Sequence, residues 1–214
     1  MCEIRPFSGT SVIERARDTP LQRSVTAGLR VNALFVYHFG MIRPAACFAA
    51  LALIAAPQSL APYFPTPEDV VDRMLVLAKV TKEDTVMDLG CGDGRIPIRA
   101  AHKYGARGIG VDIDPKLIEE ARAKAREAGV GHLVEFRLED ALTTDLSKAS
   151  VVTLYLLSSS NAKLRPRLQA ELRPGSRVVS HAFSMGQAWP ADTVDRFSSA
   201  RGDEITLYLW EIRR

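Results

Sequence analysis

From residue 62 onward, short apolar runs alternate with longer stretches in which apolar positions recur every three or four residues. The runs predict buried strands, and the periodic stretches predict amphipathic helices packed against them. Seven strands are expected, over residues 85–87, 108–112, 134–138, 151–157, 177–180, 193–197 and 205–212. Helices are expected from about residue 67, and over residues 95–104, 116–128 and 161–171.

This order of elements indicates an α/β fold. Strands that alternate with helices form a mostly parallel sheet, because each helix carries the chain back to the start of the next strand. The last two strands have no helix between them and predict a closing antiparallel pair. We therefore expect one Rossmann-like, seven-stranded domain over residues 62–214, preceded by a leader over residues 1–61.

Two helices carry recognisable end signals. Thr66 followed by Pro67 predicts an N-cap at Thr66 and a first helical residue at Pro67. Asp114 before Pro115 predicts the cap of a later helix, and Gly129 supplies the stop at the end of that helix.

The net charge of +3 raises the question of a nucleic-acid partner. The first 61 residues hold six arginines and three acidic side chains, which leaves 22 of the 28 basic and 22 of the 25 acidic residues for the domain. The domain is therefore neutral, and we expect no nucleic acid among its partners. Cys91 is the single cysteine of the domain, which excludes an internal disulfide framework.

The stretch from Asp88 to Gly94 joins a predicted strand to a predicted helix through three glycines at every second position. A strand, glycine loop and helix in this order form a nucleotide site on an open α/β sheet, because glycine lets a charged ligand approach the backbone. The spacing is G-x-G-x-G, whereas the dinucleotide fingerprint is G-x-G-x-x-G. The loop therefore favours S-adenosylmethionine (SAM) over NAD as the cofactor.

Within this loop, the carboxylate of Asp88 and the bare backbone of three glycines would hold the amino-acid portion of SAM. The glycines are Gly90, Gly92 and Gly94. Cys91 occupies a loop position that requires a small residue.

Side chains at three further strand ends match the remaining parts of SAM. Asp112 ends the second strand and would accept the ribose hydroxyls. Asp140 follows the third strand and would meet the adenine amino group, and Tyr155, near the end of the fourth, would stand where the methyl group leaves. Because the carboxyl ends of parallel strands meet at one edge of a sheet, these ends together predict a SAM site.

With these residues, the domain resembles a class I SAM-dependent methyltransferase. The part from about Tyr63 to Gly186 is similar to the mitochondrial protein-lysine methyltransferases of adenine nucleotide translocase and of the ATP synthase c-subunit, and to their bacterial relatives. The resemblance implies a protein lysine as the methyl acceptor. It is carried by residues 64–67, 88–95, 152–157, 161, 164–166 and 178–181.

Our hypothesis is in-line transfer of the methyl group to a neutral amine. Tyr155 and Asn161 are the candidates for orienting that amine, and Tyr63 and Thr66 are the candidates for closing over SAM from the N-terminal side. Two structural alternatives stay open. Tyr155 could be a core aromatic residue, and His181 is more typical of a structural hydrogen-bonding residue than of a base.

The sequence departs from the resembled group at three positions. Ser158 replaces a usual Pro and Ala182 replaces a usual Asp, and both lie on the acceptor side. Cys91 stands where relatives often have Ser, which should be tolerated. These departures therefore weaken the inference of the methyl acceptor from the resembled group more than they weaken the inference of the cofactor.

The leader divides into an unstructured extension, residues 1–40, and a signal-like or anchoring apolar segment, residues 41–61. Its apolar run, residues 45–56, is shorter than the roughly 20 residues of a transmembrane helix. Either translation begins at Met41, or the segment associates with a membrane internally; an alanine-rich helix packed on the domain is a third alternative. We expect a membrane-associated or exported protein, with a cytoplasm-facing anchor favoured because SAM is made in the cytosol.

Other functions on the same fold stay open. They are a small-molecule or quinone methyltransferase, a non-catalytic SAM-binding module and, against the glycine spacing, an NAD oxidoreductase. No metal is expected, because His102 and His132 have no paired ligands at metal spacing. The oligomeric state is open.

Overall fold

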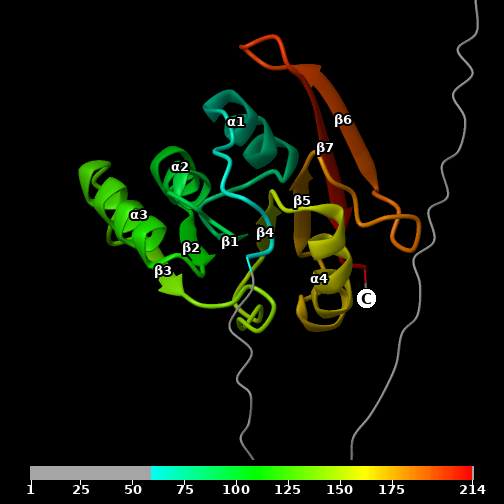
Figure 1. The fold of residues 1–214 in the computed structure, drawn as a ribbon, viewed down its shortest axis with the longest axis horizontal. Helices are drawn as coiled ribbons and strands as arrows, with labels where there is room; N and C mark the ends of the chain where they lie inside the picture. The colour runs from blue at the N-terminus through cyan, green and yellow to red at the C-terminus, as the bar shows by residue number, and fades with distance from the viewer. Residues whose placement is uncertain (1–58, 214) are drawn as a thin grey trace, which may run out of the picture. The chain divides into compact units, whose positions relative to one another are not determined.

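The computed structural model describes residues 59–213, which form a seven-stranded sheet with helices on both faces (Figure 1). The strands are β1 (Thr85–Leu89), β2 (Arg107–Asp112), β3 (Val134–Leu138), β4 (Val151–Leu154), β5 (Arg177–His181), β6 (Thr193–Ser198) and β7 (Glu204–Glu211). The helices are α1 (Glu68–Leu77), α2 (Arg95–Tyr104), α3 (Pro115–Glu127) and α4 (Ser158–Glu171). The predicted α/β class with a mostly parallel, seven-stranded sheet is confirmed.

The strand order is β3-β2-β1-β4-β5-β7-β6. Strands β1 to β5 are parallel, and β7 runs antiparallel to both β5 and β6. The chain therefore moves outward from β1 to β3 and then restarts on the other side of β1 with β4. Ligands of open α/β sheets bind in the crevice at such a reversal, outside the carboxyl ends of the strands.

The two faces of the sheet bury different helices. Val86 and Val151 pack with residues of α1 and α2, whereas Met87 and Val152 pack with residues of α4. Figure 1 shows α1, α2 and α3 in green tones beside one another, and α4 in yellow on the other side of the strands. Because consecutive strand residues point to opposite faces, one apolar run supplies both layers of the core.

The fourth predicted strand is too long. Strand β4 ends at Leu154, and α4 begins at Ser158, three residues before the predicted start of that helix. Leu156 is 4% exposed, so it belongs to the apolar core although it lies outside the sheet. An apolar run reports burial and does not distinguish a strand from the connection that follows it.

The predicted cap at Thr66 is also wrong by one residue. The N-cap of α1 is Pro67, and the helix start has no side-chain cap hydrogen bond. Thr66 is buried, and its carbonyl accepts from the Arg95 guanidinium. By contrast, Asp114 accepts from the backbone N–H of Lys116 at 2.8 Å, as predicted for the cap of α3.

The leader prediction falls almost entirely outside the described residues. The extension 1–40 and the segment 41–58 are not among them. Within residues 59–213, no helix is both long and apolar enough to span a bilayer.

Candidate active site

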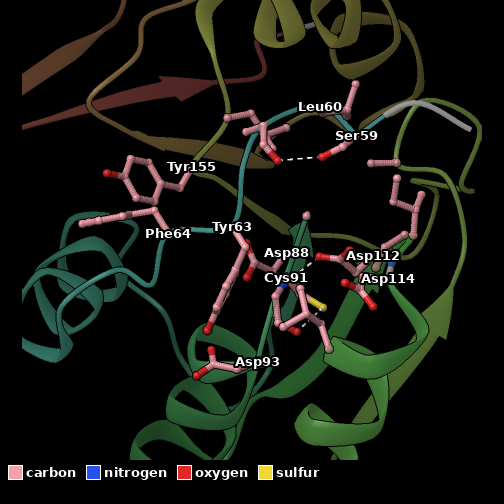
Figure 2. Close-up of a pocket in the computed structure, with 18 of the residues that line it drawn as sticks. Ser59, Leu60, Tyr63, Phe64, Asp88, Cys91, Asp93, Asp112, Asp114 and Tyr155 are labelled. Atoms are coloured by element: carbon pink, nitrogen blue, oxygen red, sulfur yellow. Dashed lines mark hydrogen bonds between the residues drawn. The ribbon is translucent and has the colours of Figure 1, made fainter.

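A cavity of about 410 Å³ lies at the carboxyl ends of β1, β2 and β4. Figure 2 shows Asp112 and Asp114 on one side of it and Tyr155 and Phe64 on the other. Nine of the eleven residues predicted for the site line this cavity: Tyr63, Thr66, Asp88, Gly90, Cys91, Gly92, Asp112, Asp140 and Tyr155. The other two, Gly94 and Asn161, lie outside the lining.

The glycine loop turns tightly beneath the cavity. The N–H groups of Gly90 and Cys91 both donate to the carbonyl of Val111, at 2.8 and 2.9 Å. At Gly92, φ is +53° and an added Cβ would lie 2.5 Å from the Tyr63 ring. The positive φ favours glycine at this position, and the half-exposed Tyr63 ring covers this cradle of bare backbone, which suits the amino-acid portion of SAM once that ring moves aside.

Gly94 has a different task in the structure. It is the N-cap of α2 and has φ +76°. An added Cβ would lie 2.6 Å from the Phe136 ring and 2.8 Å from the Cβ of Ala121. The missing side chain therefore lets α2 pack closely against α3 and β3 instead of exposing backbone to the cavity.

Asp88 is a buried carboxyl group that borders the cavity. It is 3% exposed and accepts a hydrogen bond of 2.7 Å from the Thr153 hydroxyl on the neighbouring strand. Burial raises the pKa of Asp88 to about 7. A cation placed beside it would favour the ionised form, and the ammonium group of SAM is such a cation.

The two other carboxylates are held by turns at the strand ends. Asp112 accepts from the N–H of Gly92 at 2.9 Å and from the N–H of Asp114 at 3.0 Å. Asp140 accepts from the N–H of Leu142 at 2.8 Å. Both are therefore preorganised acceptors on the cavity wall, as the predicted contacts with ribose and adenine require.

Aromatic rings form the opposite wall. Tyr155 stacks on His181 with 4.0 Å between ring centroids, and Phe64 meets Tyr155 edge-on at 6.5 Å. His181 is 4% exposed, and burial lowers its pKa to about 4, so the imidazole is neutral at pH 7. Burial also raises the pKa of Tyr155. Phe64 and Tyr155 line the cavity and His181 backs the Tyr155 ring, so this wall presents an uncharged surface.

Asn161 supports that wall from behind. It is fully buried, and its amide donates to the carbonyl of Phe183 at 2.9 Å and to the hydroxyl of Ser180 at 3.2 Å. The turn that it holds contains Ala182 at φ +63° and follows directly from His181. The side chain of Asn161 thus does not enter the cavity. It supports His181, which in turn supports the Tyr155 ring on the cavity wall.

The structure adds an ionic cluster that sequence reasoning missed. Asp93 is 2% exposed and pairs with Arg95 at 2.7 Å and with Lys124 at 2.6 Å. Burial opposes its ionisation, yet these two cations hold the pKa of Asp93 at about 2. The pairing of Asp93 with Arg95 could have been predicted, because the two residues are only two positions apart at the end of the glycine stretch. The contact with Lys124 could not, because Lys124 is 31 residues away from Asp93.

The remaining candidates give no further chemistry. Cys91 is 4% exposed, and burial raises the pKa of its thiol, which keeps the thiol protonated. Among residues 59–213, no cluster of three or more His, Cys, Asp or Glu side chains has the arrangement of a metal site.

The chain is similar in sequence to known methyltransferases. The family described as the ANTKMT methyltransferase domain matches residues 88–192. A protein-lysine N-methyltransferase of Saccharolobus islandicus (strain REY15A) is 43% identical over 152 residues, which are 71% of this chain and 93% of that protein. An adenine nucleotide translocase lysine N-methyltransferase of Mus musculus is 34% identical over 134 residues, 62% of this chain. The chain spans only 58% of that mouse protein.

A solved structure is also similar over nearly its whole length. It is described as an RNA methyltransferase from Salinibacter ruber in complex with S-adenosyl-L-homocysteine. Its sequence identity to this chain is 54%, with a TM-score of 0.66, and the match covers 71% of this chain and 95% of that one.

Proposed function

We propose that this chain, which belongs to the SAM-dependent methyltransferases of the ANTKMT methyltransferase domain family, transfers the methyl group to the side chain of a protein lysine. The methyltransferase activity and the SAM cofactor are confirmed by the relatives, one of which is solved with S-adenosyl-L-homocysteine. The acceptor is the proposed part. It follows the name of the archaeal relative, of which 93% is matched.

The observation that carries the lysine proposal is the uncharged aromatic wall of Tyr155 and Phe64, backed by the neutral His181. A lysine amine has an unperturbed pKa of about 10.4 and attacks only as the neutral base. An apolar wall disfavours the charged form. Aromatic rings also attract the methylated ammonium product. The wall therefore suits both the neutral amine that attacks and the methylated ammonium group that forms.

The residues of the chain act by holding and aligning the two reactants. Bound SAM supplies an activated methyl group. Asp88 and Asp112, with the Gly92 backbone, would hold it at one end of the cavity. The ring of Tyr155 would set the approach of the amine at the other end, and the amine proton leaves to solvent before attack. Holding two reactants in line can lower the barrier by roughly 7–11 kcal/mol without a covalent intermediate.

An RNA acceptor is the second candidate, favoured by the description of the Salinibacter ruber structure at 54% identity. The balanced charge of residues 62–214 does not provide the basic surface that RNA binding normally uses. Lysine is therefore the preferred acceptor.

Transfer from radiolabelled SAM to protein, RNA and lipid fractions of a deletion strain separates the candidates. We expect label that survives nuclease, disappears with protease and maps to a lysine. Label in RNA or in the lipid extract would replace the lysine proposal by one of its alternatives. The Asp88→Ala variant is the control: equal labelling by both proteins would remove the cofactor assignment of Asp88, and SAM binding without any transfer would favour a non-catalytic module.

Membrane association through residues 41–61 stays a proposal from the sequence. Its physical basis is the basic start and the apolar run of that segment. Fractionation of cells that express the full chain or a chain starting at Ser59 tests it. We expect only the full chain in the membrane pellet, and equal distribution of both would overturn the anchor.

A further inference from the structure

Residues 59–66, called the strap below, cross the cavity before α1 begins. All eight line it, although no strand or helix includes them. Figure 2 shows Leu60 and Tyr63 on this segment, with Tyr63 extending toward Asp93. A cofactor held in the cavity would therefore lie between the strap and the glycine loop.

The strap is tied down at its first end by packing and a hydrogen bond. The carbonyl of Leu60 accepts from the Ser160 hydroxyl at 2.5 Å. Leu60 and Ala61 pack against the core between the sheet and α4. This end belongs to the folded body of the domain.

The second end continues into α1, and a guanidinium group ties its last residue, the buried Thr66, to the glycine loop. Arg95 donates through Nη1 to the carbonyl of Thr66 at 2.7 Å. Its Nε and Nη2 donate to the carboxylate of Asp93, at 2.9 and 2.7 Å. Lys124 on α3 completes the cluster at 2.6 Å from Asp93. One arginine thus joins the strap to the glycine loop.

The middle of the strap has little support. Phe64 is 66% exposed and Tyr63 is 49% exposed. The Tyr63 ring lies over Gly92, at the surface on which the cofactor would rest. Segments with few buried contacts open at low free-energy cost, so loss of the hydrogen bond at Thr66 would let the exposed middle of the strap lift and uncover the cradle.

We propose that the strap is the exchange gate for the cofactor and that Arg95 is the positioning residue that latches it. With the contact between Arg95 and Thr66 made, the strap covers the cradle and slows cofactor release. With the contact broken, residues 62–65 lift off the cradle between the ends fixed at Leu60 and at the start of α1. The proposal rests on SAM use by this chain and is independent of the acceptor.

Arg95→Lys tests the latch while keeping a cation beside Asp93. A lysine has one nitrogen in place of the planar fork, so it cannot keep the forked pair with Asp93 and reach the Thr66 carbonyl from a second nitrogen. We expect the dissociation rate of S-adenosylhomocysteine, followed by stopped-flow, to rise about tenfold, as for the loss of one hydrogen bond to a charged group. In the ligand-free protein, chymotrypsin cleavage after the half-exposed Tyr63 should accelerate.

Arg99→Lys is the matched control. Arg99 lies one turn further along α2 and forms the same forked pair with Asp72, at 2.7 and 2.6 Å, but contacts α1 instead of the strap. We expect its S-adenosylhomocysteine dissociation rate and its rate of strap cleavage to equal those of the wild type. The latch is overturned if Arg95→Lys and Arg99→Lys behave alike in both measurements. Melting temperatures of the two variants separate a lost latch from a weakened fold.

Discussion

The two ends of the cavity are built on opposite principles. The cofactor end, at β1, β2 and β3, consists of backbone N–H groups and carboxylates such as Asp112 that are fixed by local turns. The acceptor end, at β4 and β5, consists of stacked rings such as Tyr155 and His181 brought together by packing. Charge and hydrogen bonds define one end, and an uncharged surface defines the other. Cofactor binding and acceptor alignment should therefore respond to different substitutions.

The largest effect is expected for Asp112→Ala at the cofactor end. The substitution removes the acceptor of the Gly92 N–H and the predicted partner of the ribose hydroxyls. Loss of several bonds to one charged group should weaken S-adenosylhomocysteine binding about a thousandfold, as measured by calorimetry. Asp145→Ala is the control, because that carboxylate also accepts from a turn N–H, at Ser147, but lies outside the cavity lining and should leave the affinity unchanged.

At the acceptor end, Tyr155→Ala should separate turnover from cofactor binding. Loss of the ring that aligns the amine should reduce transfer to the labelled protein about a hundredfold, while S-adenosylhomocysteine affinity stays near the wild-type value. Tyr155→Phe keeps the ring and tests the hydroxyl alone. A parallel loss of affinity and turnover in Tyr155→Ala would show that the two ends are not independent.

The pH dependence of cofactor binding should follow Asp88. Burial raises its pKa to about 7 in the free protein, so the carboxylate becomes available to the cofactor ammonium as pH rises through 7. Between pH 6 and 8, S-adenosylhomocysteine affinity should rise about tenfold. The opposite sign, or an unchanged pH dependence in Asp88→Asn, would contradict this prediction. Calorimetry in two buffers should also detect proton release on binding.

At His181 we expect an effect on stability and none on cofactor binding. Its pKa is about 4 in the folded protein and about 6.5 when unfolded, so its contribution is present above pH 6.5 and is lost as pH falls toward 4. As the pH falls through this window, the free energy of unfolding of the wild type should decrease by about 1 kcal/mol per pH unit more than that of His181→Phe. His102→Phe, at an exposed histidine on α2, should keep the wild-type profile in thermal melts.

The cofactor end was the more predictable of the two. Asp88, Gly92 and Asp112 all follow or end apolar strands within one short stretch, and their spacing identified them. Gly94 has the same spacing, but its φ of +76° serves the packing of α2 against Phe136. A glycine pattern reveals where side chains are excluded, but not whether a ligand or a neighbouring helix excludes them.

The acceptor end shows where prediction stops. Asn161 was expected to orient the amine, yet it holds the carbonyl of Phe183 behind His181. The stacking of Tyr155 on His181 joins residues from β5 and the end of β4. The latch joins Thr66 to Arg95, which are 29 positions apart. Such contacts depend on how elements pack and leave no periodic signal.

The sequence by itself determined the order of strands and helices, the glycine loop and the type of cofactor. These follow from short-range causes: the periods of 2 and 3.6 residues, and the backbone freedom of glycine. Only the tertiary structure decided which side chains reach the cavity, how Asp88 and His181 are desolvated and what holds the strap. Those properties arise from burial among residues distant in the chain, because the pKa and direction of a side chain are set by its surroundings.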